Sequence, residues 1–184
     1  KQDQYAAAYG GLNVIEFHPD GSVNVEPVYL KHEVREALNN NLKLYYIGNQ
    51  RSASAILAEQ KKNTSDEAKF NALSRMVDLV YELKEALING DLTSFGEMLH
   101  ENWMLKQSLA NGITNPRIND LYTAARDAGA LGGKLLGAGG GGFMLFYVPA
   151  ECQSSVDEAM ENLEAVPFEF NMETDGSKII HIER

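Results

Sequence analysis

Alternating and helically spaced hydrophobic positions divide the chain into short strands and amphipathic helices. Residues 12–17 and 22–29 are β-branched runs, and the Pro, Asp and Gly of residues 18–21 between them predict a hairpin turn. Residues 43–48 and 143–148 have the aromatic and aliphatic character of buried strands. The strands that this pattern predicts are short and next to turns.

Helical spacing and capping signals predict the helices. Ser, Thr, Asp or Asn precedes a helix because its side chain accepts from a free backbone N–H, and Gly follows one because it adopts a left-handed conformation. The predicted helices are residues 31–40, residues 50–60, a helix with a Thr64 and Glu67 capping box that ends at Asn89 and Gly90, a helix capped by Asp91 that ends at Asn111 and Gly112, a helix that starts at Asn115 and Pro116 and closes at Gly129, and residues 154–163.

The end of the chain alternates apolar and polar residues around Asp175 and Gly176, which predicts a closing hairpin. Helices and antiparallel strands are therefore mixed without a regular strand–helix–strand repeat. This order predicts the α+β class, a sandwich of helices on an antiparallel sheet, in preference to a doubly wound parallel sheet.

Composition narrows the possible partners. The chain has 184 residues, of which 44% are hydrophobic, enough for one sizeable core. Its formal net charge of -10 argues against nucleic acid or an anionic membrane as a partner, because either would repel it at long range. If the protein binds phosphates, a local cluster of donors has to supply the attraction.

The chain has a single cysteine, Cys152, and therefore no internal disulfide, which favours a reducing, cytoplasmic setting. No apolar run approaches the length of about 18 residues that crosses a bilayer, and the first residues lack a signal-peptide pattern, so we expect a soluble protein. Because the first residue is Lys1 and not Met, we interpret the sequence as a piece of a longer chain.

The densest local feature is GGKLLGAGGGGF, residues 132–143, in which seven of the eleven positions from Gly132 to Gly142 are glycine. Such a run indicates unusual backbone dihedrals or close approach of the backbone to something, and successive N–H groups can bind a phosphate. A hinge that lets a helix pack tightly on a sheet is the alternative. The Rossmann pattern does not apply because a strand follows the loop, and the Walker pattern fails because Leu135 follows Lys134.

Asp3 stands between two glutamines at the start of a small-residue stretch, where its carboxylate can cap a helix or face a cleft. Arg51 follows the predicted strand at residues 43–48, and a guanidinium there can hold a phosphate or form a surface ion pair. Lys134 and Arg117 are weaker candidates of the same kind. The four histidines have no metal-ligand spacing, and no serine has the nucleophile-elbow context.

Two segments in this order, QDQYAAAYGG at the start and GGKLLGAGGGGF later, resemble the GHMP kinases. They are similar to the family's catalytic-aspartate segment and to its glycine-rich third motif. NPRINDLYTAARDAGALGGKLLGAGGGGF and the KQDQYAAAYGG opening are most similar to the branch that acts on heptose 7-phosphate, and the resemblance runs along the whole chain.

The resemblance implies ATP-dependent phosphoryl transfer to the anomeric hydroxyl of D-glycero-D-manno-heptose 7-phosphate, with Mg²⁺. Asp3 would be the catalytic carboxylate, and Gln4, Arg51 and Lys134 would contact the substrate. The loop beside the phosphates would consist of Gly137, Ala138, Gly139, Gly140, Gly141 and Gly142.

The sequence departs from the family in lacking the upstream ATP phosphate loop and the magnesium ligands that accompany it. We therefore expect residues 1–30 to be a remnant of the N-terminal domain, residues 31–184 to be the C-terminal domain, and this chain to be inactive by itself. A kinase of L-fucose or another free sugar and a non-catalytic metabolite-binding domain are the alternatives. The sequence leaves the exact sugar and the oligomeric state open.

Overall fold

The computed structural model describes residues 1–48, 58, 66–137, 139–178 and 180. The chain starts with helix α1 (Gln2–Tyr9) and a hairpin of β1 (Asn13–Phe17) and β2 (Val23–Pro27), which pair as an antiparallel two-stranded sheet. Ser22 donates to the Asp20 carboxylate from its backbone N at 2.9 Å and from its hydroxyl at 2.7 Å, which closes the turn. The first predicted hairpin is confirmed.

A second sheet organises the rest of the chain. It contains β3 (Leu42–Gly48), β4 (Gly132–Leu135), β5 (Gly142–Tyr147) and β6 (Val166–Phe168), in the antiparallel order β4-β5-β3-β6. The helices are α2 (His32–Asn41), α4 (Glu67–Asn89), α5 (Leu92–Ser108), α6 (Pro116–Asp127) and α7 (Gln153–Asn162), with a short 3₁₀ turn, η1 (Ala150–Cys152), before α7. The predicted helix at residues 50–60 lies outside the described residues, apart from residue 58.

The main core lies between one face of this sheet and helices α5, α6 and α7. Trp103, Ile118 and Val156 come from these helices and pack with Tyr45 and Phe146 of the sheet, all nearly fully buried. Because successive strand residues point to opposite faces, the other face carries the partly exposed rings of Tyr46, Phe143 and Phe168.

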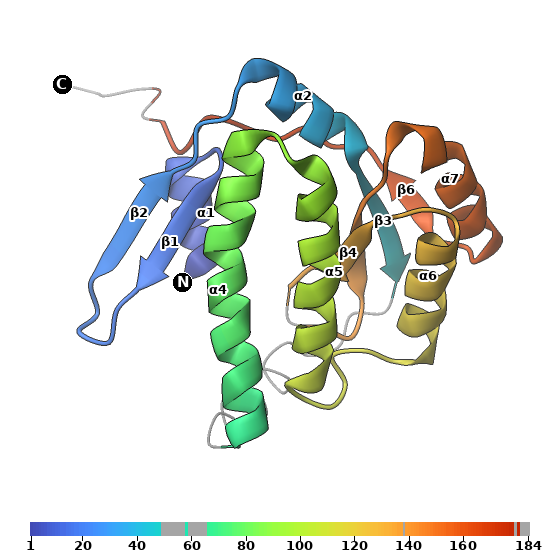
Figure 1. Ribbon diagram of the computed structural model, residues 1–184, viewed down its shortest axis with the longest axis horizontal. Coiled ribbons are helices and arrows are strands. Elements are labelled where there is room, and N and C mark those ends of the chain that lie inside the picture. The colour runs from blue at the N-terminus through green and yellow to red at the C-terminus, as the bar shows by residue number, and fades with distance from the viewer. Residues whose placement is uncertain (49–57, 59–65, 138, 179, 181–184) are drawn as a thin grey trace.

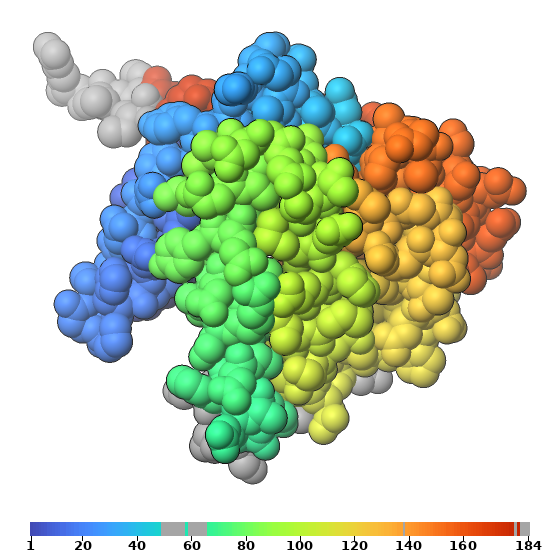
Figure 2. Space-filling model, viewed as in Figure 1, coloured from blue at the N-terminus to red at the C-terminus, as the bar shows by residue number. Residues whose placement is uncertain are grey.

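Figure 1 shows α4 and α5 side by side, with α5 next to β4, with α6 and α7 on the far side of the sheet and the β1–β2 hairpin on the other side of α4. In the space-filling view α4 and α5 form one continuous surface, and the hairpin projects beyond it (Figure 2). The architecture is an antiparallel sheet with helices packed on it, which confirms the α+β prediction.

Local capping signals in the sequence correctly predicted most helix boundaries. The Asp91 side chain accepts from Ser94 N, the Asn115 side chain accepts from Ile118 N, and Gly90 ends α4 in a left-handed conformation with φ 75°. Two predicted boundaries are wrong. Asp66, not Thr64, caps α4 by accepting from Lys69 N, and α5 ends at Ser108, before the Asn111–Gly112 pair.

The sequence pattern does not predict strand β4, because residues 132–142 have the glycine content of a loop. Gly132 and Gly133 pair with Tyr147 and Phe146 of β5. A Cβ atom on Gly132 would lie 2.0 Å from Gly96 O of α5, so only glycine allows this helix to approach the strand so closely.

The described part of the predicted closing hairpin around Asp175 and Gly176 does not form a strand, and residues 179 and 181–184 of its second arm lie outside the described residues. After β6 the described residues form no further strand, and the segment runs along the end of α1 instead. Gly11 N donates to Glu173 O at 3.1 Å, and Ser177 N donates to Ala8 O at 3.1 Å. These contacts tie the end of the chain to its beginning. No helix among the described residues is long and apolar enough to cross a membrane.

Candidate phosphate-handling site

The loop between β4 and β5 follows a path that glycine makes possible. Positive φ angles occur at Gly137 (73°), Gly139 (118°), Gly140 (82°), Gly141 (154°) and Gly142 (104°). Residues with a Cβ rarely adopt such angles, so substitution at these positions strains the backbone. Ala138, the remaining predicted loop residue, lies outside the described residues.

One side of this loop is packed and bonded to the segment after α5. Gly140 N donates to Ile113 O at 3.0 Å, and a Cβ on Gly139 would lie 2.8 Å from Ile113 Cα. A Cβ on Gly137 or Gly142 would meet no described atom within 4 Å. The loop is therefore held at its middle and has open space beside its first and last glycines.

Two lysines lie at the base of the loop. Lys106 Nζ on α5 donates to Gly137 O at 2.6 Å and to Leu135 O at 3.3 Å. Lys134 Nζ on β4 donates to Asn102 Oδ1 at 3.3 Å. Burial lowers the pKa of both amines, and with a smaller contribution from the charge of Lys134 it lowers the pKa of Lys106 to about 8.

Lys106 was not among the residues predicted from the sequence. It follows Leu99 and Trp103 at helical spacing, on the stripe through which α5 contacts the core, and both of these residues are buried. A lysine on an otherwise apolar helix face is the signal that would have identified it.

Asp3 lies in the first turn of α1, and its carboxylate is exposed. Within the described residues its side chain forms no hydrogen bond or ion pair, and the helix has no side-chain cap, so the capping role that the sequence allowed is not observed. Gln4 is also exposed. Both side chains are available to a ligand.

The structure brings only some of the predicted site residues together. Lys134 lies in β4 next to the loop, whereas no hydrogen bond or ion pair among the described residues joins Asp3 or Gln4 to that loop. Arg51 lies outside the described residues. Arg117, the weaker candidate, donates to Leu163 O at 3.2 Å and so links α6 to the end of α7.

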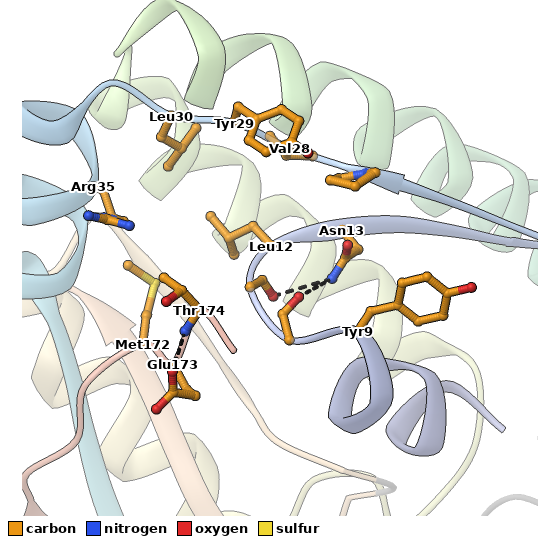
Figure 3. Close-up of a pocket in the computed structure, with 13 residues that line it drawn as sticks. Tyr9, Leu12, Asn13, Val28, Tyr29, Leu30, Arg35, Met172, Glu173 and Thr174 are labelled. Atoms are coloured by element: carbon orange, nitrogen blue, oxygen red, sulfur yellow. Dashed lines mark hydrogen bonds between the residues drawn. The ribbon is translucent and has the colours of Figure 1, made fainter. Parts of the chain in front are cut away.

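A cavity of about 530 Å³ opens at the other end of α1. Arg35 of α2 and Tyr9 at the end of α1 lie on opposite sides of it, and Leu12, Leu30 and Met172 give it an apolar lining (Figure 3). It shares no lining residue with the glycine-rich loop. The cavity and the loop are therefore separate features of the chain.

Among the histidines that the structure describes, His100 is partly buried, whereas His18 and His32 are exposed. Its Nδ1 lies 2.8 Å from the Tyr122 hydroxyl, and the two rings stack at 5.9 Å. Burial, with a smaller effect from Arg126, lowers the pKa of His100 and favours the neutral ring. Within the part of the chain that the structure describes, no group of three or more His, Cys, Asp or Glu could hold a metal ion.

Comparison with known proteins connects this fold to one family. The family model described as GHMP kinases C terminal matches residues 83–166. D-glycero-alpha-D-manno-heptose 7-phosphate kinase of Campylobacter jejuni is 30% identical over 177 residues, which are 96% of this chain and 52% of that protein. The crystal structure of a D-glycero-D-manno-heptose 1-phosphate kinase from Bacteroides thetaiotaomicron matches with a TM-score of 0.66 and 28% identity, over 98% of this chain and 49% of that one.

Other relatives differ in their acceptors. Mevalonate kinase of Pyrococcus horikoshii is 30% identical over 146 residues, 76% of this chain and 43% of that protein. The L-fucokinase/L-fucose-1-P guanylyltransferase of Bacteroides fragilis is 33% identical over 115 residues, 61% of this chain and 12% of that protein.

These matches cover the helices, the sheet and the glycine-rich loop, and they define the class of protein: the chain contains the C-terminal domain of the GHMP kinases at residues 83–166. Among those kinases it is similar, at modest identity, to kinases of heptose phosphates. The chain spans about half the length of these two relatives.

Proposed function

We propose that this chain is part of an ATP-dependent kinase that phosphorylates the anomeric hydroxyl of D-glycero-D-manno-heptose 7-phosphate to the 1,7-bisphosphate. The observation that carries the proposal is the glycine-rich loop with open space at its first and last glycines and two half-buried ammonium groups at its base. Similarity to heptose phosphate kinases over nearly the whole chain supports the choice of acceptor.

The roles of the residues follow from phosphoryl-transfer chemistry. A bond forms between the acceptor oxygen and the γ-phosphorus while the bond from that phosphorus to the leaving ADP breaks, and the hydroxyl proton must leave. Asp3 orients the hydroxyl and accepts its proton, which requires an accessible carboxylate such as the one observed. Gln4 and Lys134 bind the substrate, and Arg51 binds the sugar's own phosphate.

The loop fits the phosphates of ATP, since its glycines let the backbone approach an anion and its lysines supply positive charge. In this proposal residues 137–142 lie beside the transferred group. ATP, when bound with Mg²⁺, supplies that group. The resemblance to the family supports assigning the ligands of this metal to the N-terminal segment of the kinase.

We further propose that residues 1–30 belong to the N-terminal domain of the kinase and residues 31–184 to its C-terminal domain. The separate two-stranded sheet within residues 13–27 supports this division, as does a family model that begins well after it. The chain by itself would then lack the main ATP loop and be inactive. We assign the protein to the cytoplasm, with ATP and a sugar phosphate as its partners.

The test is a mass-spectrometric product assay on this chain alone and on a chain joined to a GHMP kinase N-terminal domain. ATP and Mg²⁺ are offered with heptose 7-phosphate, free heptose, L-fucose, galactose or mevalonate. We expect the joined chain to make a bisphosphate from heptose 7-phosphate and no product from the other acceptors, and we expect no product from this chain by itself. Asp3→Asn should lower kcat by about a hundredfold or more, because it removes the proton acceptor. Asp78→Asn, at an exposed position of α4, is the matched control and should retain activity.

The fucokinase relative supports a second candidate, a kinase of L-fucose or another free sugar. Product from a free sugar in the same panel would favour it, because dependence on the 7-phosphate separates the two acceptors. In the joined protein, no product from any acceptor, or full activity in Asp3→Asn, would refute the kinase assignment and favour a non-catalytic metabolite-binding domain.

A further inference from the structure

The base of the glycine-rich loop contains positive charge that pairs with no acidic side chain in the described part of the chain. None of the ion pairs among the described residues includes Lys106 or Lys134. The charge of Lys134 acts on Lys106, and both amines are partly removed from water. Two like charges in such a position disfavour each other, so an anion that binds between them is stabilised by both.

The hydrogen bonds of these lysines leave donors for a ligand. An ammonium group has three N–H donors. Lys106 uses two of them on Gly137 O and Leu135 O, and Lys134 uses one on Asn102 Oδ1. One donor on Lys106 and two on Lys134 are not accounted for by these bonds. They suffice for the oxygens of one phosphate group.

Lys106 also controls the electrostatics of the loop itself. A carbonyl oxygen beside a phosphate would repel it, since both carry negative charge. The carbonyl oxygens of Leu135 and Gly137 are bound to Lys106, so their partial negative charges face the ammonium group. The positive φ of Gly137 allows this orientation at the point where the strand becomes the loop.

We propose that Lys106 and Lys134 form a binding site for one phosphate group at the base of the glycine-rich loop, with Lys106 also fixing the position of Gly137. This inference rests on the proposed function and extends it. Lys106 becomes a residue of the site, and the anion is held by side chains as well as by backbone amides. The phosphate can come from the nucleotide or from the sugar phosphate, which share this chemistry.

The first experiment measures binding of inorganic pyrophosphate to this chain, which needs no catalysis. Trp103, the sole tryptophan, lies one helical turn from Lys106 and reports binding through its fluorescence, with calorimetry as the independent readout. The variants are Lys106→Met, Lys106→Arg and Lys134→Met. Lys31→Met is the matched control, since it removes the same charge from an exposed position outside the site.

We expect Lys106→Met and Lys134→Met each to raise the pyrophosphate Kd by about tenfold, as expected for loss of one charged hydrogen bond. Lys106→Arg should retain most of the affinity, because it keeps the charge and the donors. Lys31→Met should bind like the unmodified chain. Far-UV circular dichroism and urea unfolding confirm that each variant is folded. If Lys106→Met folds poorly, Lys106→Arg and Lys134→Met provide the test.

Unchanged affinity in both methionine variants would overturn the inference, as would an equal loss in Lys31→Met or no binding to the unmodified chain. The titration is repeated with a non-hydrolysable ATP analogue and with heptose 7-phosphate. The ligand whose affinity falls in Lys106→Met is the source of the phosphate that this site binds. If the Lys106→Met variant of the joined protein still transfers phosphate and binds pyrophosphate with normal affinity, the proposed site is refuted and the kinase assignment stands. If the joined protein binds pyrophosphate normally but transfers no phosphate to any acceptor, the kinase assignment is refuted and the proposed phosphate site stands.

Discussion

The lowered pKa of Lys106 predicts a pH-dependent stability that one substitution removes. Burial, with a smaller effect from the charge of Lys134 on β4, lowers this pKa from 10.5 to about 8 in the folded chain. Unfolding restores the ordinary value, so between these two pH values the unfolded state binds a proton that the folded state has released. The stability that this group contributes is fully present above pH 10.5 and is lost as the pH falls through about 8.

The size of the effect follows from the two pKa values. A difference of about 2.5 corresponds to about 3.4 kcal/mol, at about 1.4 kcal/mol for each tenfold change. Because the side chain of Lys106 is partly exposed, solvent screens the interaction, and we expect about 2 kcal/mol. Lys106→Met has a side chain of similar length without a titratable group, so it should lose this pH dependence.

The assay is urea unfolding of the unmodified chain and of Lys106→Met, from about pH 7 to about pH 10.5, followed through the fluorescence of the buried Trp103. The unfolding free energy of the unmodified chain minus that of the variant should rise by about 2 kcal/mol across this range. The contributions of groups that titrate in both proteins cancel in this difference. A flat difference for Lys106→Met would refute the claim that Lys106 is desolvated.

Two further substitutions test the packing around the sheet. Gly132→Ala places a methyl group against Gly96 O, so the free energy of unfolding should fall by about 2 kcal/mol or more, and an unchanged urea midpoint would show that α5 can move away. Tyr45→Phe removes the 2.5 Å hydrogen bond to the partly exposed carboxylate of Asp157, at an expected cost of about 1 kcal/mol in urea unfolding, and a stabilised variant would contradict this role.

The parts of the fold that could be predicted from the sequence depend on short-range chemistry. Asp91 and Asn115 accept from a backbone N–H three residues ahead, and Gly90 adopts its left-handed conformation next to the helix that it ends. Each signal lies within a few residues of its effect. Two of the failed predictions, the closing hairpin and the loop in place of strand β4, required knowledge of distant partners. The alternating residues near Asp175 suit a hairpin, yet that segment bonds to the end of α1.

Residues of the candidate site could be predicted only where the local sequence around them was itself unusual. Lys134 stood within a glycine-rich segment and was therefore noticed. Lys106 is an ordinary helix residue until β4 packs against α5 and brings Leu135 O and Gly137 O to its amine. Strand β4 itself was missed because Gly132 is typical of loops, whereas here it permits close packing. The apolar helix face can draw attention to Lys106 in the sequence, but its contact with the loop follows only once β4 is recognised.

The sequence of the glycine-rich segment allowed two interpretations, close packing and anion binding, and the structure supports each of them at different residues. Close packing accounts for Gly132, Gly133 and Gly139, since a Cβ on each would lie within 3 Å of a neighbouring atom. Packing does not account for Gly137 and Gly142, which have positive φ and no described neighbour near a built Cβ. Backbone conformation and open space at these two positions are what a loop needs to receive an anion. In a chain with a net charge of -10, the attraction must come from charges at the loop itself. The two lysines at its base meet this requirement over a few ångströms, where they act more strongly than the distant acidic surface because solvent and salt screen charges that are far away.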